Sequence, residues 1–137
     1  MDAPGHRDFV PNMMAGAAEA DVAILVIDAV ANAFESGFKI AKTSKDFCGQ
    51  TIEHIYILKS LGIKKMIVVV NKMDLIGFSK EQFKEIKETV FIFLKSVGFK
   101  KKHVTFIPTS ALLGLNLIKK DTKNMLWYKG LSFLDQL

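Results

Sequence analysis

Ile67-Val-Val-Val-Asn-Lys-Met-Asp74 is the stretch of sequence that decides the fold. Its β-branched first half predicts a strand over residues 66–70, and its polar second half predicts a loop directly after that strand. Open α/β sheets bind their ligands in the crevice beyond the carboxyl ends of the strands. The loop 71–74 is therefore the first candidate for a binding site.

The rest of the chain alternates between strand patterns and helix patterns, which is typical of βα units on a parallel sheet. Further strands are predicted over residues 23–27 and 104–107. Helices are predicted up to about Glu19, over 50–61, from Ser79 to Gly98, and over 122–135. Ser79 and Gln82 form a capping box before the third helix, whereas Gly130 interrupts the fourth. The predicted fold class is α/β with a parallel sheet.

Length and composition indicate one domain. With 137 residues, half of them hydrophobic, the chain has the size of a single compact domain spanning 1–137. Its apolar runs are far shorter than the roughly 20 residues that cross a bilayer, so no membrane span is predicted. The first residues contain neither a basic leader nor an apolar signal core, which predicts a cytoplasmic protein. The single Cys48 can form no internal disulfide and is assigned no chemistry.

The net charge of +5 is distributed unevenly along the chain. Residues 1–38 carry six acidic residues and one basic residue, whereas residues 39–137 carry eight acidic and eighteen basic residues. A basic half of this kind suits contact with RNA or a ribosome surface. It is also typical of a solvated lysine-rich rim, and no aromatic residues interleave for base stacking.

The side chains of the loop 71–74 suit recognition of a guanine base. The Asp74 carboxylate can accept hydrogen bonds from both the ring N–H and the exocyclic amine of guanine, a donor pair that adenine lacks on that edge. A bidentate match of this kind contributes about 1–3 kcal/mol of discrimination. Lys72 would lay its aliphatic stem over the base plane, and Asn71 would tie the loop and contact the ring edge. An ordinary polar turn after a strand is the other interpretation of these residues.

A second set of candidate residues follows the strand predicted over 104–107. Thr109-Ser110-Ala111 has small side chains, so its backbone N–H groups can approach a carbonyl oxygen such as guanine O6. By themselves, Ser110 and Ala111 are also typical of a helix cap. Their spacing beyond the loop 71–74 supports the guanine-binding interpretation.

The N-terminal residues Asp2-Ala-Pro-Gly-His6 offer groups suited to a nucleotide phosphate. The Asp2 carboxylate could hold a Mg²⁺-bound water while the Gly5 N–H meets a terminal phosphate. His6 could orient an attacking water. A simple N-terminal turn explains the same residues, so the pentapeptide alone leaves both interpretations open.

Together these motifs resemble the translational GTPase superfamily, and the resemblance extends over nearly the whole chain. Residues 2–12, 34–38, 49–51, Glu53-His54 and 127–130 are similar to the elongation factor 1-alpha group. Within that group, Val10-Pro11, 106–110 and 127–131 resemble the ribosome-rescue GTPase that delivers Pelota. The release-factor GTPase is the next candidate.

The resemblance implies a three-layer αβα G domain of the P-loop NTPase type that binds GTP or GDP with Mg²⁺. It implies GTP hydrolysis on the ribosome by a cytoplasmic factor that loads a tRNA-shaped, Pelota-like partner into the A site. In the family, the residues matching Asp2, Gly5 and His6 serve the magnesium ion, the terminal phosphate and the hydrolytic water. The guanine base would be read by Asn71, Lys72, Asp74, Ser110 and Ala111.

The chain departs from the family pattern in ways that affect function. Ile52 stands where the family has arginine, and residues 39–48 form a longer polar insert. No G-x-x-x-x-G-K-[ST] phosphate loop occurs in the sequence. We therefore expect a G domain that lacks its first strands, phosphate loop and first switch, and that hydrolyses no GTP by itself.

The same incompleteness predicts an apolar, unpaired edge on the strand 23–27, and hence self-association through that edge. The alternative function is a non-catalytic module that binds ribosomal RNA or a protein partner through its basic half.

Overall fold

A computed structural model of the chain describes residues 21–30 and 50–137. Asp2, Gly5, His6, the helix predicted up to Glu19 and the insert 39–48 lie outside the described residues. The described elements follow in the order β1 (Val22–Asp28), α3 (Gln50–Ser60), β2 (Lys65–Asn71), the 3-10 helix η2 (Met73–Ile76), α4 (Lys80–Val97), the 3-10 helix η3 (Lys101–His103), β3 (Val104–Pro108) and α5 (Phe133–Gln136).

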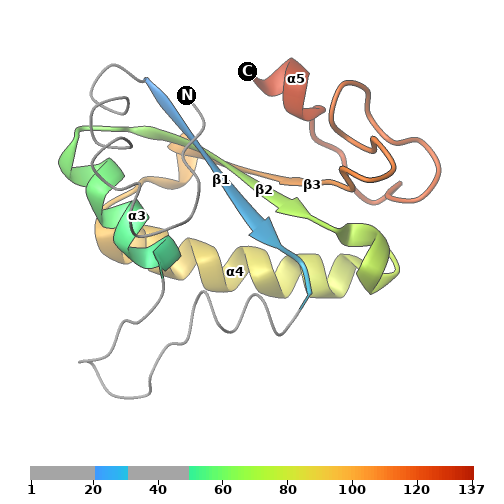
Figure 1. Cartoon of the computed structure of the whole chain (residues 1–137), viewed down its shortest axis with the longest axis horizontal. Helices are drawn as coiled ribbons and strands as arrows, with labels where there is room; N and C mark the ends of the chain where they lie inside the picture. Colours follow the sequence, from blue (N-terminus) through green and yellow to red (C-terminus); the bar gives the residue numbers. More distant parts are fainter. Residues whose placement is uncertain (1–20, 31–49) are drawn as a thin grey trace.

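The three strands form one parallel sheet in the order β1-β2-β3 (Figure 1). At their carboxyl ends, Asp28 of β1 pairs with Asn71 of β2, and Val70 of β2 pairs with Pro108 of β3. This register brings the loops that follow the three strands to the same edge of the sheet. The predicted α/β fold with a parallel sheet is confirmed.

The central strand β2 is buried on both faces, which explains its unbroken β-branched sequence. Val68 and Val70 are fully buried in the core that lies against α3 and α4. On the opposite face, Val69 packs against Tyr128 and Phe133 from the C-terminal segment. Figure 1 accordingly shows three layers, with α3 and α4 on one side of the sheet and the segment that ends in α5 on the other.

The long helix α4 begins and ends where the sequence predicts. The Ser79 hydroxyl accepts a hydrogen bond from the Gln82 N–H at 3.2 Å. The Ser79 N–H donates to the Ile76 carbonyl at 3.3 Å and not to the Gln82 side chain, so only one half of the capping box forms. At the other end, Gly98 has φ 102°, a conformation that favours glycine and stops the helix.

The helix predicted over 122–135 is wrong, because only Phe133–Gln136 are helical. The buried Asp121 carboxylate accepts hydrogen bonds from the backbone N–H groups of Lys123, Asn124 and Met125, which holds these residues in a turn. Side chains of this kind compete with helical hydrogen bonding. Ser132 then caps the short helix α5 through the Asp135 N–H at 3.3 Å.

One face of β1 is exposed. Val22, Ile24 and Val26 are 36%, 46% and 63% exposed, whereas the alternate side chains of the strand lie in the core. Within residues 21–30 and 50–137, β1 also pairs on one side only. The self-association that we expect from this strand stays a prediction. Among the described helices, none is long and apolar enough to span a membrane.

Candidate functional site

The candidate site lies where the three strands end. The loop after β2 is tied to its neighbours by backbone hydrogen bonds on both sides. The Ala29 N–H donates to the Asn71 carbonyl at 2.8 Å, and the Met73 N–H donates to the Thr109 carbonyl at 3.1 Å. The two loops that carry the predicted guanine-binding residues therefore lie side by side.

Asn71 fastens these two loops together through its side chain. Its Oδ1 atom accepts hydrogen bonds from the Ala111 N–H at 2.9 Å and from the Thr109 hydroxyl at 3.3 Å. The loop-tying role predicted for Asn71 thus has a concrete basis, with partners 38 and 40 residues away. Because the Ala111 N–H already donates to Asn71 Oδ1, a guanine carbonyl oxygen that bound to Ala111 would share this N–H with Asn71.

Asp74 lies in the first turn of η2 and is half-buried. Its Oδ1 atom accepts a hydrogen bond from the Ser110 hydroxyl at 2.5 Å. Ser110 is itself fully buried, so its hydroxyl holds the carboxylate from within the protein. Among the described residues, Oδ2 of Asp74 has no recorded partner, which leaves acceptor capacity for an incoming donor pair.

Lys72 has an unusual backbone conformation. Its φ of 63° and ψ of 34° are left-handed, which costs a residue other than glycine about 1–2 kcal/mol. Its exposed side chain reaches back to Asp28 at the end of β1, with Nζ 2.5 Å from Oδ2. The other oxygen of Asp28 accepts the Val30 N–H at 2.9 Å. A strained backbone held in this way is typical of functional loops.

Sequence reasoning missed one member of this arrangement, Asp28, and named Thr109 only for its small side chain within the segment 109–111. Asp28 could have been identified from its position. It directly follows the strand predicted over 23–27, and the carboxyl ends of parallel strands lie at the same edge of the sheet. No sequence signal indicated that the fully buried Thr109 hydroxyl donates to Asn71 Oδ1.

The predicted phosphate side of the site, Asp2, Gly5 and His6, lies outside the described residues. Within the described part of the chain, no group of three or more His, Cys, Asp or Glu residues could hold a metal ion. The structure therefore brings together Asn71, Lys72, Asp74, Ser110 and Ala111, and these five residues define the base side of the candidate site.

Comparison with known proteins places the chain in a family. The family described as elongation factor Tu GTP binding domain matches residues 1–136. An elongation factor 1 alpha-like protein of Schizosaccharomyces pombe is 52% identical over 141 residues, covering 99% of this chain and 23% of that protein. Protein HBS1 of Drosophila melanogaster is 47% identical over 137 residues, covering 98% of this chain and 19% of that protein. The chain thus spans about a fifth to a quarter of the length of these relatives.

Solved structures agree with this assignment. Sup35 complexed with GDP matches with a TM-score of 0.77 and 35% identity, over 98% of this chain and 30% of that one. The GTPase-like domain of Saccharomyces cerevisiae Ski7, bound to GDP and inorganic phosphate, matches with a TM-score of 0.66 and 30% identity, over 86% of this chain and 25% of that one. The predicted resemblance to translational GTPases of the elongation factor 1-alpha group is confirmed, and the chain belongs to the elongation factor Tu GTP-binding domain family.

Proposed function

We propose that residues 71–74 and 109–111 read the guanine base of GTP or GDP. The observation that carries this proposal is the Asp74 carboxylate, which Ser110 holds through one oxygen while the other oxygen has no hydrogen-bond partner among residues 21–30 and 50–137. A carboxylate fixed in this way can accept both the ring N–H and the amine of guanine. Lys72 covers the base plane, and Asn71 keeps the two loops in register.

The proposed reaction of the whole protein is hydrolysis of GTP with Mg²⁺. In this assignment Asp2 holds the ion through a water, the Gly5 N–H meets the terminal phosphate and His6 orients the attacking water. Phosphoryl transfer depends almost entirely on positioning and electrostatic stabilisation. Because the sequence contains no phosphate-loop motif, the residues present here form the base-reading and switch-side part of a G domain and do not complete its phosphate site.

The proposed setting is translation in the cytoplasm. The relatives include elongation factor 1-alpha proteins, an elongation factor 1 alpha-like protein and Protein HBS1. A factor of this group would act on the ribosome together with a tRNA-shaped, Pelota-like rescue or release partner.

Nucleotide competition tests the base-reading proposal. Fluorescent GDP bound to the full-length protein is displaced by unlabelled GDP or ADP, and GDP should compete at least about tenfold better, because adenine offers Asp74 no donor pair. Equal competition by ADP and GDP would contradict the proposal. Ribosome-stimulated phosphate release tests the hydrolysis step, which His6→Ala should slow without changing the affinity for GDP.

A second candidate function is RNA binding by the opposite end of the sheet. Desolvation and the positive charges of Lys102, Lys100, Lys65 and Lys64 lower the pKa of His103, so these lysines create a positive field around it. Such a surface suits a phosphate backbone. RNA binding of this kind would weaken with salt and be unaffected by Asp74→Ala.

A further inference from the structure

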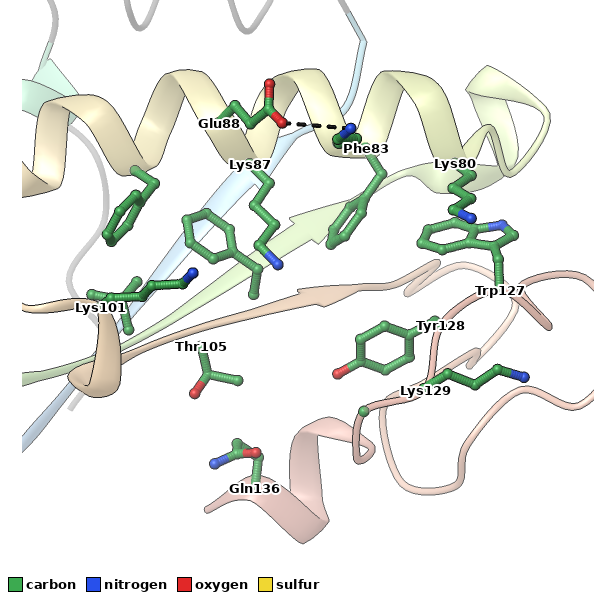
Figure 2. A pocket seen from close by; sticks show the side chains of 15 residues that line it. Lys80, Phe83, Lys87, Glu88, Lys101, Thr105, Trp127, Tyr128, Lys129 and Gln136 are labelled. Atoms are coloured by element: carbon green, nitrogen blue, oxygen red, sulfur yellow. Dashed lines mark ion pairs between the residues drawn. The ribbon is translucent and has the colours of Figure 1, made fainter.

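A second concave site runs along the outer edge of β3, away from the guanine-reading loops. It is a groove of about 760 Å³ with α4 on one side and the C-terminal segment on the other (Figure 2). None of the residues that line it belongs to 71–74 or 109–111. The groove is therefore independent of the proposed nucleotide site.

The floor of the groove is aromatic and firmly packed. Phe83 and Phe106 are each only 7% exposed. The Trp127 ring lies against Phe83 with 5.2 Å between centroids, and its Nε1 atom donates a hydrogen bond to the Phe78 carbonyl at 3.0 Å. These contacts fix an apolar surface that could accept an apolar side chain.

The rim of the groove is positively charged. Among the described residues that line it, Glu88 is the single acidic one, and its carboxylate lies 3.8 Å from the Lys84 ammonium. The Lys87 ammonium extends over the Phe106 ring, 5.8 Å from its centroid. The ligand that complements this groove is therefore anionic. The described lysines that line the groove are Lys80, Lys84, Lys87, Lys101 and Lys129.

The backbone of β3 also offers hydrogen-bonding groups to the groove. Among the described residues β3 pairs with β2 alone. The Thr109 N–H donates to the Val70 carbonyl of β2, so alternate residues of the strand, Thr105 and Ile107, direct their backbone groups toward β2. The N–H and C=O of Phe106 consequently point outward into the groove. The outward groups on either side are partly engaged, because the Val104 N–H donates to the Lys101 carbonyl and the Pro108 carbonyl accepts from Asn116 Nδ2 at 2.9 Å, so the free edge centres on Phe106.

These features favour a peptide over a nucleic acid. A single-stranded nucleic acid would stack its bases on fully exposed ring faces, but Phe83 and Phe106 are buried in the floor and Trp127 and Tyr128 are half-buried. An extended peptide can instead pair with the outward backbone groups of β3 while its side chains contact the floor and the rim.

We propose that the groove binds an acidic, extended peptide segment of a partner protein, which adds as a strand to the free edge of β3. Apolar side chains of the peptide lie against the half-buried rings of Trp127 and Tyr128. Its carboxylates lie among the rim lysines, with Lys87 and Lys101 nearest to β3 (Figure 2).

Fluorescence anisotropy with a labelled peptide Asp-Glu-Ile-Phe-Val-Glu-Asp tests this proposal on the purified protein. Lys87→Glu and Lys101→Glu should each weaken binding roughly tenfold, because an attractive charge pair becomes a repulsive one. The matched control is Lys119→Glu, which reverses an exposed lysine that does not line the groove and should leave binding unchanged. Unchanged GDP affinity in all three variants separates this result from the nucleotide site and shows that the variants are folded.

Two N-methylated peptides test the strand geometry. One is methylated at its odd-numbered residues and the other at its even-numbered residues, so each blocks the N–H groups of one edge. Strand addition requires that one of them loses binding while the other keeps it. The proposal is overturned if both peptides bind like the parent, if Lys119→Glu weakens binding as much as Lys87→Glu, if no saturable binding occurs, or if oligouridine displaces the peptide at lower concentration than the peptide itself.

Discussion

Replacing Asp121 with alanine should destabilise the C-terminal segment, because this carboxylate organises the turn that follows it. Its oxygens accept the backbone N–H groups of Lys123 at 3.0 Å, Asn124 at 2.9 Å and Met125 at 2.7 Å. A hydrogen bond to a charged group contributes roughly 1.5–3 kcal/mol, and an unsatisfied buried donor costs a similar amount. Lys123 and Asn124 are exposed, so water can replace two of the three bonds. Met125 is fully buried, so its N–H would lose its partner.

The expected loss in the free energy of unfolding is therefore about 2–4 kcal/mol for Asp121→Ala. Asp121→Asn keeps one acceptor oxygen and should lose about half as much. Urea denaturation followed by Trp127 fluorescence measures both variants, since Trp127 lies in the affected segment. An alanine variant with the midpoint of the unmodified protein would refute this account of the turn.

The stability that the Asp121 carboxylate contributes depends on pH. Burial raises the pKa of Asp121, but the hydrogen bonds from Lys123, Met125 and Asn124 outweigh burial and lower the pKa below its usual value of 3.8. A depressed folded-state pKa stabilises the protein above the unfolded-state pKa, and this stability is lost as the pH falls through the folded-state pKa. The difference between the unmodified protein and Asp121→Asn should persist from pH 7 to pH 4 and shrink below about 3.8. A difference that stays constant to the lowest measurable pH would contradict the assignment.

Three further predictions concern the strand ends and the basic end of the sheet. Ser110→Ala removes the hydroxyl that holds Asp74 and should weaken GDP binding roughly threefold to thirtyfold in a fluorescence titration; unchanged affinity would mean that Asp74 needs no such support. Asp28→Ala frees the exposed Lys72 ammonium and should speed GDP dissociation less than about fivefold, whereas Lys72→Ala also removes the stem proposed to cover the base and should speed it more; equal effects of the two substitutions would contradict a contact between the Lys72 stem and the base. His103 should titrate below 6.5 by NMR at low salt and closer to that value at high salt, because salt screens the neighbouring lysines; a salt-independent pKa would exclude their influence.

Local patterns were sufficient to predict most of the fold. The strand predicted over 66–70 is the central part of β2, and Ser79 and Gly98 mark the ends of α4 as expected. These signals depend on residues a few positions apart, namely β-branched runs, caps and glycine stops. Parallel pairing then follows from the alternation of strands and helices.

The errors came from interactions that a local pattern does not contain. The periodicity over 122–135 predicts a helix, but a single buried carboxylate at Asp121 binds three N–H groups and prevents it. The ion pair between Lys72 and Asp28 joins residues 44 positions apart. The β3 groove likewise combines α4, β3 and the C-terminal segment, so its lysines appear in the sequence as separate, unremarkable charges.

That the residues predicted to read the base would lie side by side was predictable, because they belong to short motifs after consecutive strands. The register of β2 and β3 places Asn71 and Asp74 beside Ser110 and Ala111, as the shared edge of a parallel sheet requires. What the motifs did not reveal is that Asn71 already engages the Ala111 N–H. In the proposed site, a guanine O6 that bound the Ala111 N–H would therefore share this donor with Asn71.

Exchange of base preference in Asp74→Asn is the most direct measurement of guanine reading by this chain. The substitution replaces a carboxylate oxygen with an amide that donates, and xanthine carries a carbonyl where guanine carries its amine. The unmodified protein should be competed by GDP in preference to xanthosine diphosphate, and Asp74→Asn should shift that preference toward xanthosine diphosphate by at least about tenfold. If the variant keeps the guanine preference of the unmodified protein, Asp74 does not contact the base, and the proposed function of residues 71–74 is wrong.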